Sequence, residues 1–201
     1  MKFAVTLAAA LIACSTQVAA SSPLLGPEEV QPGVYAIDTK ETLVRYGVIH
    51  MGFTEFWGTF PGATGTLTLD PKAVANAKLE VTVPVVSVET TNRELNYQFF
   101  SNEFFDAEKY PVMRFVSTSV TRTGDRTAKV AGNLTMHGVT KPVVFDVTFN
   151  AAGPNAFNHV PTIGFKGEGV VKRSDFGLGK YVPIVSDETT ITISAAFEKK
   201  G

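Results

Sequence analysis

The sequence predicts an all-β protein, built as an antiparallel up-and-down barrel. The first observation is a period-two alternation of apolar and polar side chains, which is typical of strands rather than helices. Between residues 143 and 149 the odd positions are Val, Phe, Val and Phe, whereas the even positions are mostly polar. The second observation is the presence of fifteen phenylalanines, on stretches broken by Gly, Pro and Asn. The alternation recurs at Leu79, Val81 and Val83, and at Ile191, Ile193, Ala195 and Phe197.

Strand candidates follow one another along the chain, and most are joined by short turns such as Gly124-Asp125. Gly132 and Asn133 inside one candidate indicate a bulge or a sharp corner, as a curved sheet needs. Many short strands in succession favour a barrel, because closure removes exposed sheet edges. The candidates are residues 34–38, 42–51, 53–60, 65–70, 78–84, 113–123, 127–136, 142–150, 163–172 and 189–198.

The segment after Thr90 breaks the β pattern. Thr90 or Thr91 provides an N-cap for a helix over residues 92–99, and Ser101 provides one for a short turn over residues 102–105. Aromatic side chains are concentrated in this segment. We therefore expect it to lie across one end of the barrel, where large apolar residues plug or line the mouth.

Residues 1–20 have the pattern of an export signal. Lys2 supplies a positive start, and the apolar run that follows is too short to span a bilayer and ends in small residues. A second interpretation takes Cys14 as the acylated first residue of a lipoprotein. Both interpretations place the protein in the cell envelope. The predicted organisation is a signal peptide at 1–20, an irregular leader at 21–32 and one barrel domain at 33–201.

The charge composition gives no indication of a nucleic-acid partner or of an anionic membrane surface. The chain has 18 Lys and Arg against 19 Asp and Glu, and no basic cluster beyond Lys199-Lys200. Nothing therefore indicates binding of nucleic acid or of an anionic surface. Cys14 is the only cysteine, so the mature domain has no disulfide, and about 180 residues bury a sizeable core without one.

Two motifs carry a resemblance to a known family. The first reads Phe-Phe-Asp-Ala-Glu-Lys-Tyr-Pro at residues 104–111, and the second reads Gly-Asn-Leu-Thr-Met-His-Gly-Val-Thr-Lys-Pro at residues 132–142. Together with the segments at 87–90 and 173–177, they resemble the YceI family, and the similarity extends over residues 35–198.

The resemblance implies a lipocalin-like antiparallel barrel of about eight strands around a long hydrophobic cavity. It also implies a periplasmic location and the binding of a polyisoprenoid or a similar long-chain amphiphile, often by a homodimer. One departure concerns an Asp-x-His-Leu-Arg-like stretch that many members carry in the helical insert. Here Gln98 stands at the histidine position and Phe100 at the arginine position, so a head-group role for those charged residues does not carry over.

The three histidines lie far apart and show no metal-ligand spacing. His50 has the same strand parity as Tyr46 and Val48, which places it on an apolar face. Two roles are open for His50 on this face. It contacts the head group of a ligand, or it is a core histidine whose ring is hydrogen-bonded. His137 precedes Gly138, and we expect its side chain to bind the backbone of the turn.

Arg173 begins the most polar cluster of the chain, with Ser174 and Asp175 beside it. Arg173 either binds a phosphate or carboxylate at the cavity mouth, or pins a loop through a pair with Asp175. Ser174 has no neighbouring histidine, and the chain lacks the Gly-x-Ser-x-Gly and Ser-x-x-Lys motifs. We therefore predict no catalytic, metal or cofactor site.

Aromatic side chains are the main candidates for contact with an apolar ligand. Aromatic residues on strands also serve simply as core, so parity alone does not separate lining from filling. Small residues among the large ones leave room, and together with the resemblance they favour a cavity. Besides His50 and Arg173, the predicted ligand-binding residues are Phe53, Phe56, Trp57, Phe60, Phe99, Phe100, Phe115, Phe145 and Phe165.

These observations lead to three hypotheses. The first is a periplasmic protein that binds, stores or transports a polyprenyl or quinone-like lipid. The second is an enzyme that acts on such lipids, which convergence of His50 with Arg173 or a carboxylate would favour. The third is a non-catalytic module that docks on an envelope membrane protein, which a filled barrel without a cavity would favour.

Overall fold

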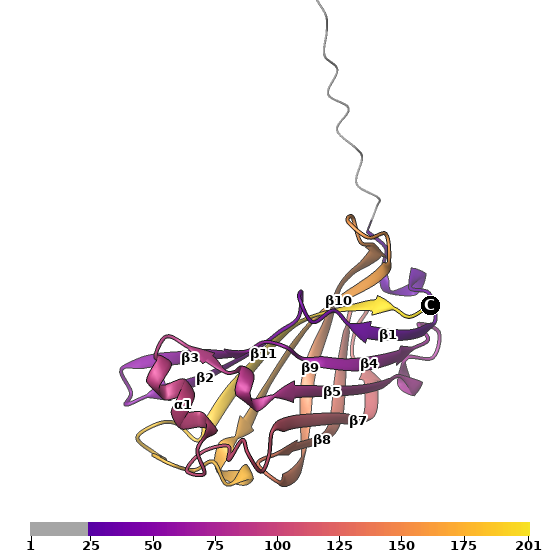
Figure 1. The fold of residues 1–201 in the computed structure, drawn as a ribbon. Coiled ribbons are helices and arrows are strands. Elements are labelled where there is room, and N and C mark those ends of the chain that lie inside the picture. The colour runs from indigo at the N-terminus through magenta and orange to yellow at the C-terminus, as the bar shows by residue number, and fades with distance from the viewer. Residues whose placement is uncertain (1–23) are drawn as a thin grey trace, which may run out of the picture.

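The computed structural model describes residues 24–201, and all described strands belong to one antiparallel sheet that curls into a barrel (Figure 1). The predicted signal peptide and the alternative lipidation of Cys14 lie outside the described residues. The strands are β1 (Gly33–Ile37), β2 (Leu43–His50), β3 (Thr54–Phe60), β4 (Thr64–Leu69), β5 (Lys78–Pro84), β6 (Glu89–Thr90), β7 (Val112–Arg122), β8 (Thr127–Met136), β9 (Val139–Pro154), β10 (Pro161–Lys172) and β11 (Glu188–Lys199). The helical elements are η1 (Pro27–Glu29), η2 (Val74–Asn76), η3 (Val85–Ser87), α1 (Arg93–Phe100) and η4 (Arg173–Phe176).

Eight strands close the barrel, in the order β1-β4-β5-β7-β8-β9-β10-β11. β11 also pairs with β1, where Tyr35 lies opposite Lys199, so the two ends of this series are hydrogen-bonded neighbours. The prediction of an antiparallel barrel of about eight strands with a short helical insert is confirmed.

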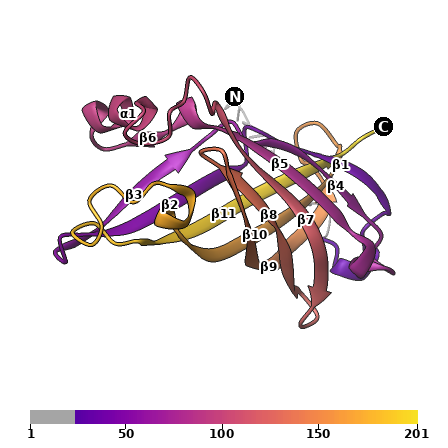
Figure 2. The same cartoon turned by 90° about the horizontal axis from the view of Figure 1, so that it is seen from below.

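β2 and β3 extend one wall of the barrel beyond its closed part. β11 is long enough to pair with β1 through its C-terminal half and with β2 through its N-terminal half, where Ile191 lies opposite Tyr46. β3 pairs in turn with β2 and with the two-residue strand β6. Figure 2 shows α1 over this extension. We call this end of the barrel the mouth, and the opposite end, where the N-terminal leader lies, the base.

Asn92 caps α1. Its Oδ1 accepts hydrogen bonds from the backbone N–H groups of Glu94 and Leu95, at 3.0 and 3.3 Å. The cap predicted at Thr90 or Thr91 is therefore wrong, and the Thr90 hydroxyl instead donates to a side-chain amide of the helix. Among residues 24–201, no helix combines the length and the hydropathy needed to cross a membrane.

A bulge in β7 lies opposite Gly132 of β8. The register between the two strands shifts between Ser117 and Ser119, which face Gly132 and Ala131. The irregularity predicted at Gly132 is thus present, with the extra residue in the partner strand. Glycine is required at this position, because a Cβ would come within 2.4 Å of the Phe115 ring.

The described part of the leader packs against the base. The Leu25 backbone N–H donates to the Ala152 carbonyl of β9 at 2.7 Å, and Val30 is only 5% exposed. The Glu28 carboxylate forms an ion pair with Arg122 of β7 at 3.0 Å. From residue 24 onward the leader contains the short helix η1 and packs against the base of the barrel.

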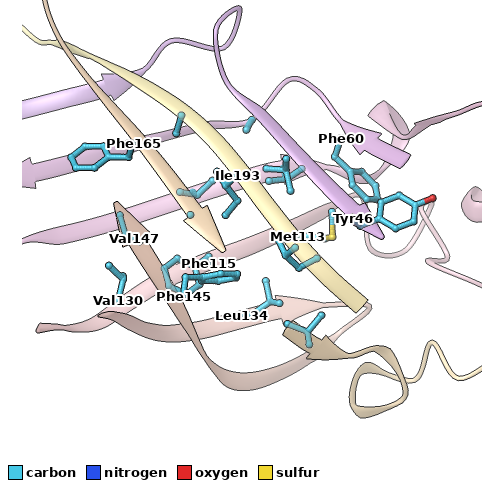
Figure 3. Close-up of a pocket in the computed structure, with 18 of the residues that line it drawn as sticks. Tyr46, Phe60, Met113, Phe115, Val130, Leu134, Phe145, Val147, Phe165 and Ile193 are labelled. Carbon is cyan, nitrogen blue, oxygen red and sulfur yellow. The ribbon is translucent and has the colours of Figure 1, made fainter. Parts of the chain in front are cut away.

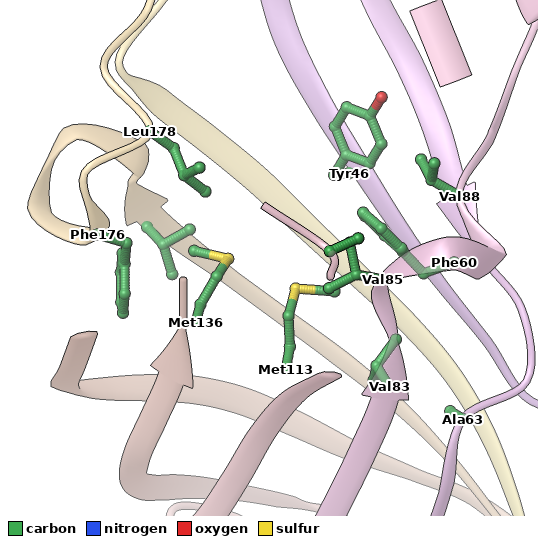
Figure 4. Packing of buried hydrophobic residues seen from close by; sticks show 12 residues of the cluster. Tyr46, Phe60, Ala63, Val83, Val85, Val88, Met113, Met136, Phe176 and Leu178 are labelled. Carbon is green, nitrogen blue, oxygen red and sulfur yellow. The ribbon is translucent and has the colours of Figure 1, made fainter. Parts of the chain in front are cut away.

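A cluster of buried side chains lies at the mouth end of the barrel (Figure 4). Tyr46 and Phe60 contribute from the β2–β3 wall, Met113 and Met136 from β7 and β8, and Phe176 from η4. A separate cluster, which includes Tyr35 and Val30, lies at the base. The apolar interior therefore extends between two differently built ends.

Candidate binding cavity

An elongated cavity of about 740 Å³ occupies the interior of the barrel. Leu95 and Phe99 of α1 line it at the mouth, and Pro27 and Val30 of the leader line it at the base, so it runs the length of the barrel. Its wall is almost wholly apolar. Figure 3 shows side chains of several strands pointing into this common space. The volume lies within the roughly 300–1,000 Å³ usual for small-molecule sites.

The alternation that predicts the strands also builds the lining. Phe145, Val147 and Phe149 of β9 all face the cavity, as the sequence pattern predicts. Gly167 of β10 faces it as well. A Cβ at Gly167 would meet Ile193 at an ordinary contact distance of 3.4 Å. Glycine here therefore leaves space in the cavity rather than relieving a clash.

Most of the predicted ligand-binding residues lie on the cavity wall, and they come from strands far apart in the sequence. The aromatic segment after Thr90 also reaches the cavity, through Phe99, Phe104 and Phe105. The predicted residues that line the cavity are His50, Phe56, Phe60, Phe99, Phe115, Phe145, Phe165 and Arg173.

Phe53, Trp57 and Phe100 lie outside the cavity, and the prediction that they line it is wrong. Phe53 is in the β2–β3 turn and is 86% exposed. Trp57 is on the outer face of β3, where the Arg45 guanidinium lies 4.1 Å from its ring centroid. Adjacent strand residues point to opposite faces, so the inward position of Phe56 excludes Trp57 from the lining. Phe100 packs edge-on against Tyr97 instead, on α1.

Tyr46 is a cavity residue whose role the sequence did not reveal. Its ring packs against Phe60 and Phe99, with centroids 5.6 and 6.0 Å away. The Tyr46 ring lies over the backbone of Gly58 in β3. A Cβ atom at Gly58 would come within 2.4 Å of this ring. The Tyr46 hydroxyl is buried, and burial raises the pKa of this hydroxyl well above its ordinary value.

The hydroxyls of Tyr46 and Thr189 have no hydrogen-bond partner among the described residues. Both residues line the cavity, but their hydroxyl oxygens are themselves buried away from its open space. Tyr46 and His50 have the same strand parity, and this pattern indicates from the sequence that Tyr46 faces inward. Nothing in the sequence indicated that its hydroxyl lacks a partner.

Arg173 pins the loop that follows η4. Its guanidinium donates to the backbone carbonyls of Ser186, Lys180 and Val185 at 2.8, 2.6 and 2.8 Å, and also to that of Leu178. Burial lowers the pKa of Arg173, and a nearby carboxylate, that of Asp187, partly opposes this shift. The neighbouring carboxylate is thus Asp187 rather than the predicted Asp175.

Asp187 fixes the other side of the same loop. Its carboxylate accepts hydrogen bonds from the Ser174 backbone N–H at 2.8 Å and from the Ser174 hydroxyl at 2.7 Å. These bonds hold the pKa of Asp187 below its ordinary value. His137 is a further structural contact, since its Nδ1 lies 3.0 Å from the Phe176 carbonyl oxygen. Within residues 24–201, no three His, Cys, Asp or Glu side chains are grouped as metal ligands would be.

A closed antiparallel barrel that encloses a long apolar cavity defines a lipocalin-like protein. The sequence profile of the YceI-like domain matches residues 35–197. The chain therefore belongs to the YceI-like family, as its motifs predicted.

Relatives of similar length support this assignment. A protein of Pseudomonas fluorescens named UPF0312 protein is 37% identical over 167 residues, which cover 80% of this chain and 84% of the relative. The crystal structure of BcnA from Burkholderia cenocepacia superposes with a TM-score of 0.72 at 27% identity, covering 80% of this chain and 98% of BcnA. A domain of Saccharophagus degradans, described as polyisoprenoid-binding and implicated in plant cell wall breakdown, superposes with a TM-score of 0.63. It covers 85% of this chain and all of the domain, but its 12% identity shows the fold alone.

Proposed function

We propose that this protein binds a polyisoprenoid, or a similar long-chain amphiphilic lipid, inside the barrel. The observation that carries the proposal is the apolar cavity of about 740 Å³ that extends from α1 to the leader. A cavity of this shape matches an extended hydrocarbon chain better than a compact polar metabolite. The description of the Saccharophagus degradans domain as polyisoprenoid-binding supports the choice of ligand class.

The energetics favour exchange of the lipid over permanent storage. Removing one methylene from water is favourable by about 0.8 kcal/mol. A long lipid in a membrane already avoids water, however, so its transfer into the cavity is an exchange between two apolar environments. Binding measured against the membrane is then nearly balanced, which suits a carrier that loads and unloads.

A periplasmic location is part of the proposal. It is supported by the export pattern of residues 1–20. Lipidation at Cys14 is the alternative route to the same compartment. The homodimer implied by the family resemblance stays a prediction, which sedimentation of the mature protein tests.

Binding fits the cavity better than the two alternatives. An enzyme would need converging polar groups, but the His50 ring lies against Phe56, with centroids 6.4 Å apart. The Arg173 guanidinium is engaged by four backbone carbonyls. A pure docking module would not need a cavity. The volume inside the barrel therefore favours a ligand-binding protein.

Titration of the mature protein with geranylgeraniol tests this function. We expect saturable binding with one lipid per barrel, measured by displacement of a fluorescent polyene lipid. Failure to bind geranylgeraniol, longer prenyl alcohols and quinones would contradict the proposal.

A further inference from the structure

The outer edge of the mouth carries a group of exposed apolar side chains. Elsewhere in the described part of the chain, exposed apolar side chains are mostly scattered one per element, such as Val34 on β1 and Val144 on β9. Scattered residues of this kind are normal, whereas a contiguous group marks a contact surface. At the mouth, five of them lie on the β2–β3 turn and on the loop after η4, with exposed fractions of 38% to 86%. We call them the rim: Met51, Phe53, Tyr181, Val182 and Ile184.

Hydrogen bonds join the two rim segments into one surface. The Met51 N–H donates to the Ile184 carbonyl at 2.8 Å. Ser186 binds the backbone of Ile49 twice, because its N–H donates to the Ile49 carbonyl at 2.9 Å and its hydroxyl oxygen accepts from the Ile49 N–H at 3.0 Å. Segments that are more than a hundred residues apart in the sequence therefore form a single apolar edge.

The loop that carries half of the rim is held in place by the fold. The Arg173 guanidinium donates to the carbonyls of Lys180 and Val185 at 2.6 and 2.8 Å, on either side of three rim residues. An arginine that satisfies these carbonyls fixes the backbone between them. The rim side chains are thus exposed by an ordered loop, and their exposure is a feature of the folded protein.

The rim is continuous with the interior of the barrel. Met51, Tyr181 and Ile184 line the cavity as well as being exposed, whereas Phe53 and Val182 lie outside the lining. An apolar surface therefore leads from the outside of the mouth to the cavity wall. A lipid that moves between a bilayer and the cavity would expose its chain to water unless the mouth touches the bilayer, and this exposure is unfavourable for every methylene.

The rim carries little charge. Residues 46–54 contain no Asp, Glu, Lys or Arg, and residues 177–186 contain only Lys180. Lys180 is paired with Glu103 and lies over the rings of Phe104 and Tyr181. Surfaces of this kind enter the interfacial region of a membrane through their buried apolar area. Because the rim has no cluster of cations, we expect its contact with a bilayer not to require anionic lipids.

The base offers no comparable surface. Arg122, Asp125 and Arg126 border the cavity there. Glu28 of the leader is paired with Arg122 at 3.0 Å. A bilayer pressed against the base would remove water from these charges, which is unfavourable. Of the two ends, the mouth is therefore the one that fits an apolar contact.

The geometry points to docking of the rim on a lipid bilayer, with the cavity facing it, so that the lipid passes between the two without crossing water. This inference rests on the proposed function and adds the membrane as the partner of the mouth. The occupant of the rim is the bilayer itself, and the contact is made by apolar side chains.

The first test measures the contact directly. Trp57→Phe removes the only tryptophan, and Phe53→Trp in this background introduces a single tryptophan in the rim. With vesicles of phosphatidylcholine, we expect its emission to shift to shorter wavelength and to be quenched by brominated acyl chains. Phe157→Trp in the same background is the control, because Phe157 is 96% exposed in the β9–β10 turn at the base end (Figure 1). Its emission should not change.

The second test measures transfer of a fluorescent polyene lipid between phosphatidylcholine vesicles. Phe53→Glu places a charge in the rim, and Phe157→Glu places the same charge on an equally exposed phenylalanine at the base. We expect Phe53→Glu to transfer the lipid at least about tenfold more slowly than the wild type, because burying a phenylalanine is worth at least that factor. Phe157→Glu should match the wild type. Neither residue lines the cavity, so the affinity of both variants for geranylgeraniol in solution should be unchanged.

The outcomes separate this inference from the proposed function. If the wild type binds geranylgeraniol, but the rim tryptophan is neither shifted nor quenched or Phe53→Glu transfers as fast as the wild type, docking is overturned and the proposed function stands. If Phe53→Glu dissociates a dimer without slowing transfer, a second copy covers the rim and docking is likewise overturned. If the wild type binds no lipid in solution, the proposed function itself fails.

Discussion

The two ends of the barrel enclose the same cavity by different means. At the base, charged side chains bind specific partners: Glu28 pairs with Arg122, and Arg126 donates to the carbonyls of Phe149 and Asn150. At the mouth, apolar side chains of the β2–β3 turn and of the loop after η4 are exposed, and Arg173 holds this loop by donating to its backbone carbonyls. We infer from this difference that a ligand enters at the mouth rather than at the base.

The largest expected effect comes from obstruction of the space between the two ends. Gly167→Leu places a side chain in the cavity, next to Ile193 and without a backbone clash. We expect the affinity for geranylgeraniol to fall at least about tenfold, because the new side chain occupies the path of the ligand. Titration by displacement of a fluorescent lipid measures this change.

Gly164→Leu is the matched control on the same strand. Gly164 is outside the cavity lining, and a Cβ there meets Asn150 at 3.7 Å. This variant should bind the lipid as the wild type does. Equal affinity of Gly167→Leu and Gly164→Leu would contradict the assignment of the cavity as the binding site.

A separate effect, on stability rather than on affinity, should distinguish the mouth from the base. Arg173→Leu leaves four backbone carbonyls of the mouth loop without their donor, so we expect the free energy of unfolding to fall by about 2–4 kcal/mol. Urea denaturation measures it. If Arg173 instead served a phosphate head group, its replacement would weaken binding of prenyl phosphate with little loss of stability.

The next effect is a loss of stability at alkaline pH. Burial raises the pKa of Tyr46 in the folded protein above its ordinary value of 10.0. The unfolded chain therefore releases this proton first, and stability falls as the pH rises above about 10, by up to about 1.4 kcal/mol per pH unit. Tyr46→Phe should remove this part of the loss. Urea denaturation at about pH 9 and about pH 11 compares the two proteins, and identical pH dependence would contradict the burial of this hydroxyl.

The smallest change in stability should come from a substitution at the base of the barrel. The Glu28–Arg122 pair is largely exposed to solvent, since the two side chains retain 64% and 45% of their accessible surface. Glu28→Gln should therefore change the free energy of unfolding by less than about 1 kcal/mol and leave lipid binding unchanged. A large loss of binding in this variant would show that the base, too, controls access.

Much of the barrel could be predicted from the sequence, because one face of each strand is buried and the alternation records it. The inward position of His50 and the outward position of Arg45 both follow from strand parity. The same rule would have excluded Trp57 once Phe56 was placed inside. The short strand β6 has only two residues, which is too few for an alternation to show.

The functional details could not be predicted, because they depend on neighbours that are distant in the sequence. Arg173 selects its carbonyl partners only after the loop has folded around it. The Tyr46 hydroxyl lacks a partner because the side chains that fold over it are Phe60 and Phe99. The contact between Met51 and Ile184 joins segments that the sequence keeps far apart.

Native mass spectrometry of the mature protein, purified from the envelope of the cells that produce it, tests the central claim most directly. Organic extraction and lipid analysis of the same sample would identify the cargo. We expect one long-chain lipid per barrel, with a mass that corresponds to a polyisoprenoid or a similar chain. A spectrum that shows only the bare protein, and that stays unchanged after incubation with prenyl alcohols and quinones, would contradict the account.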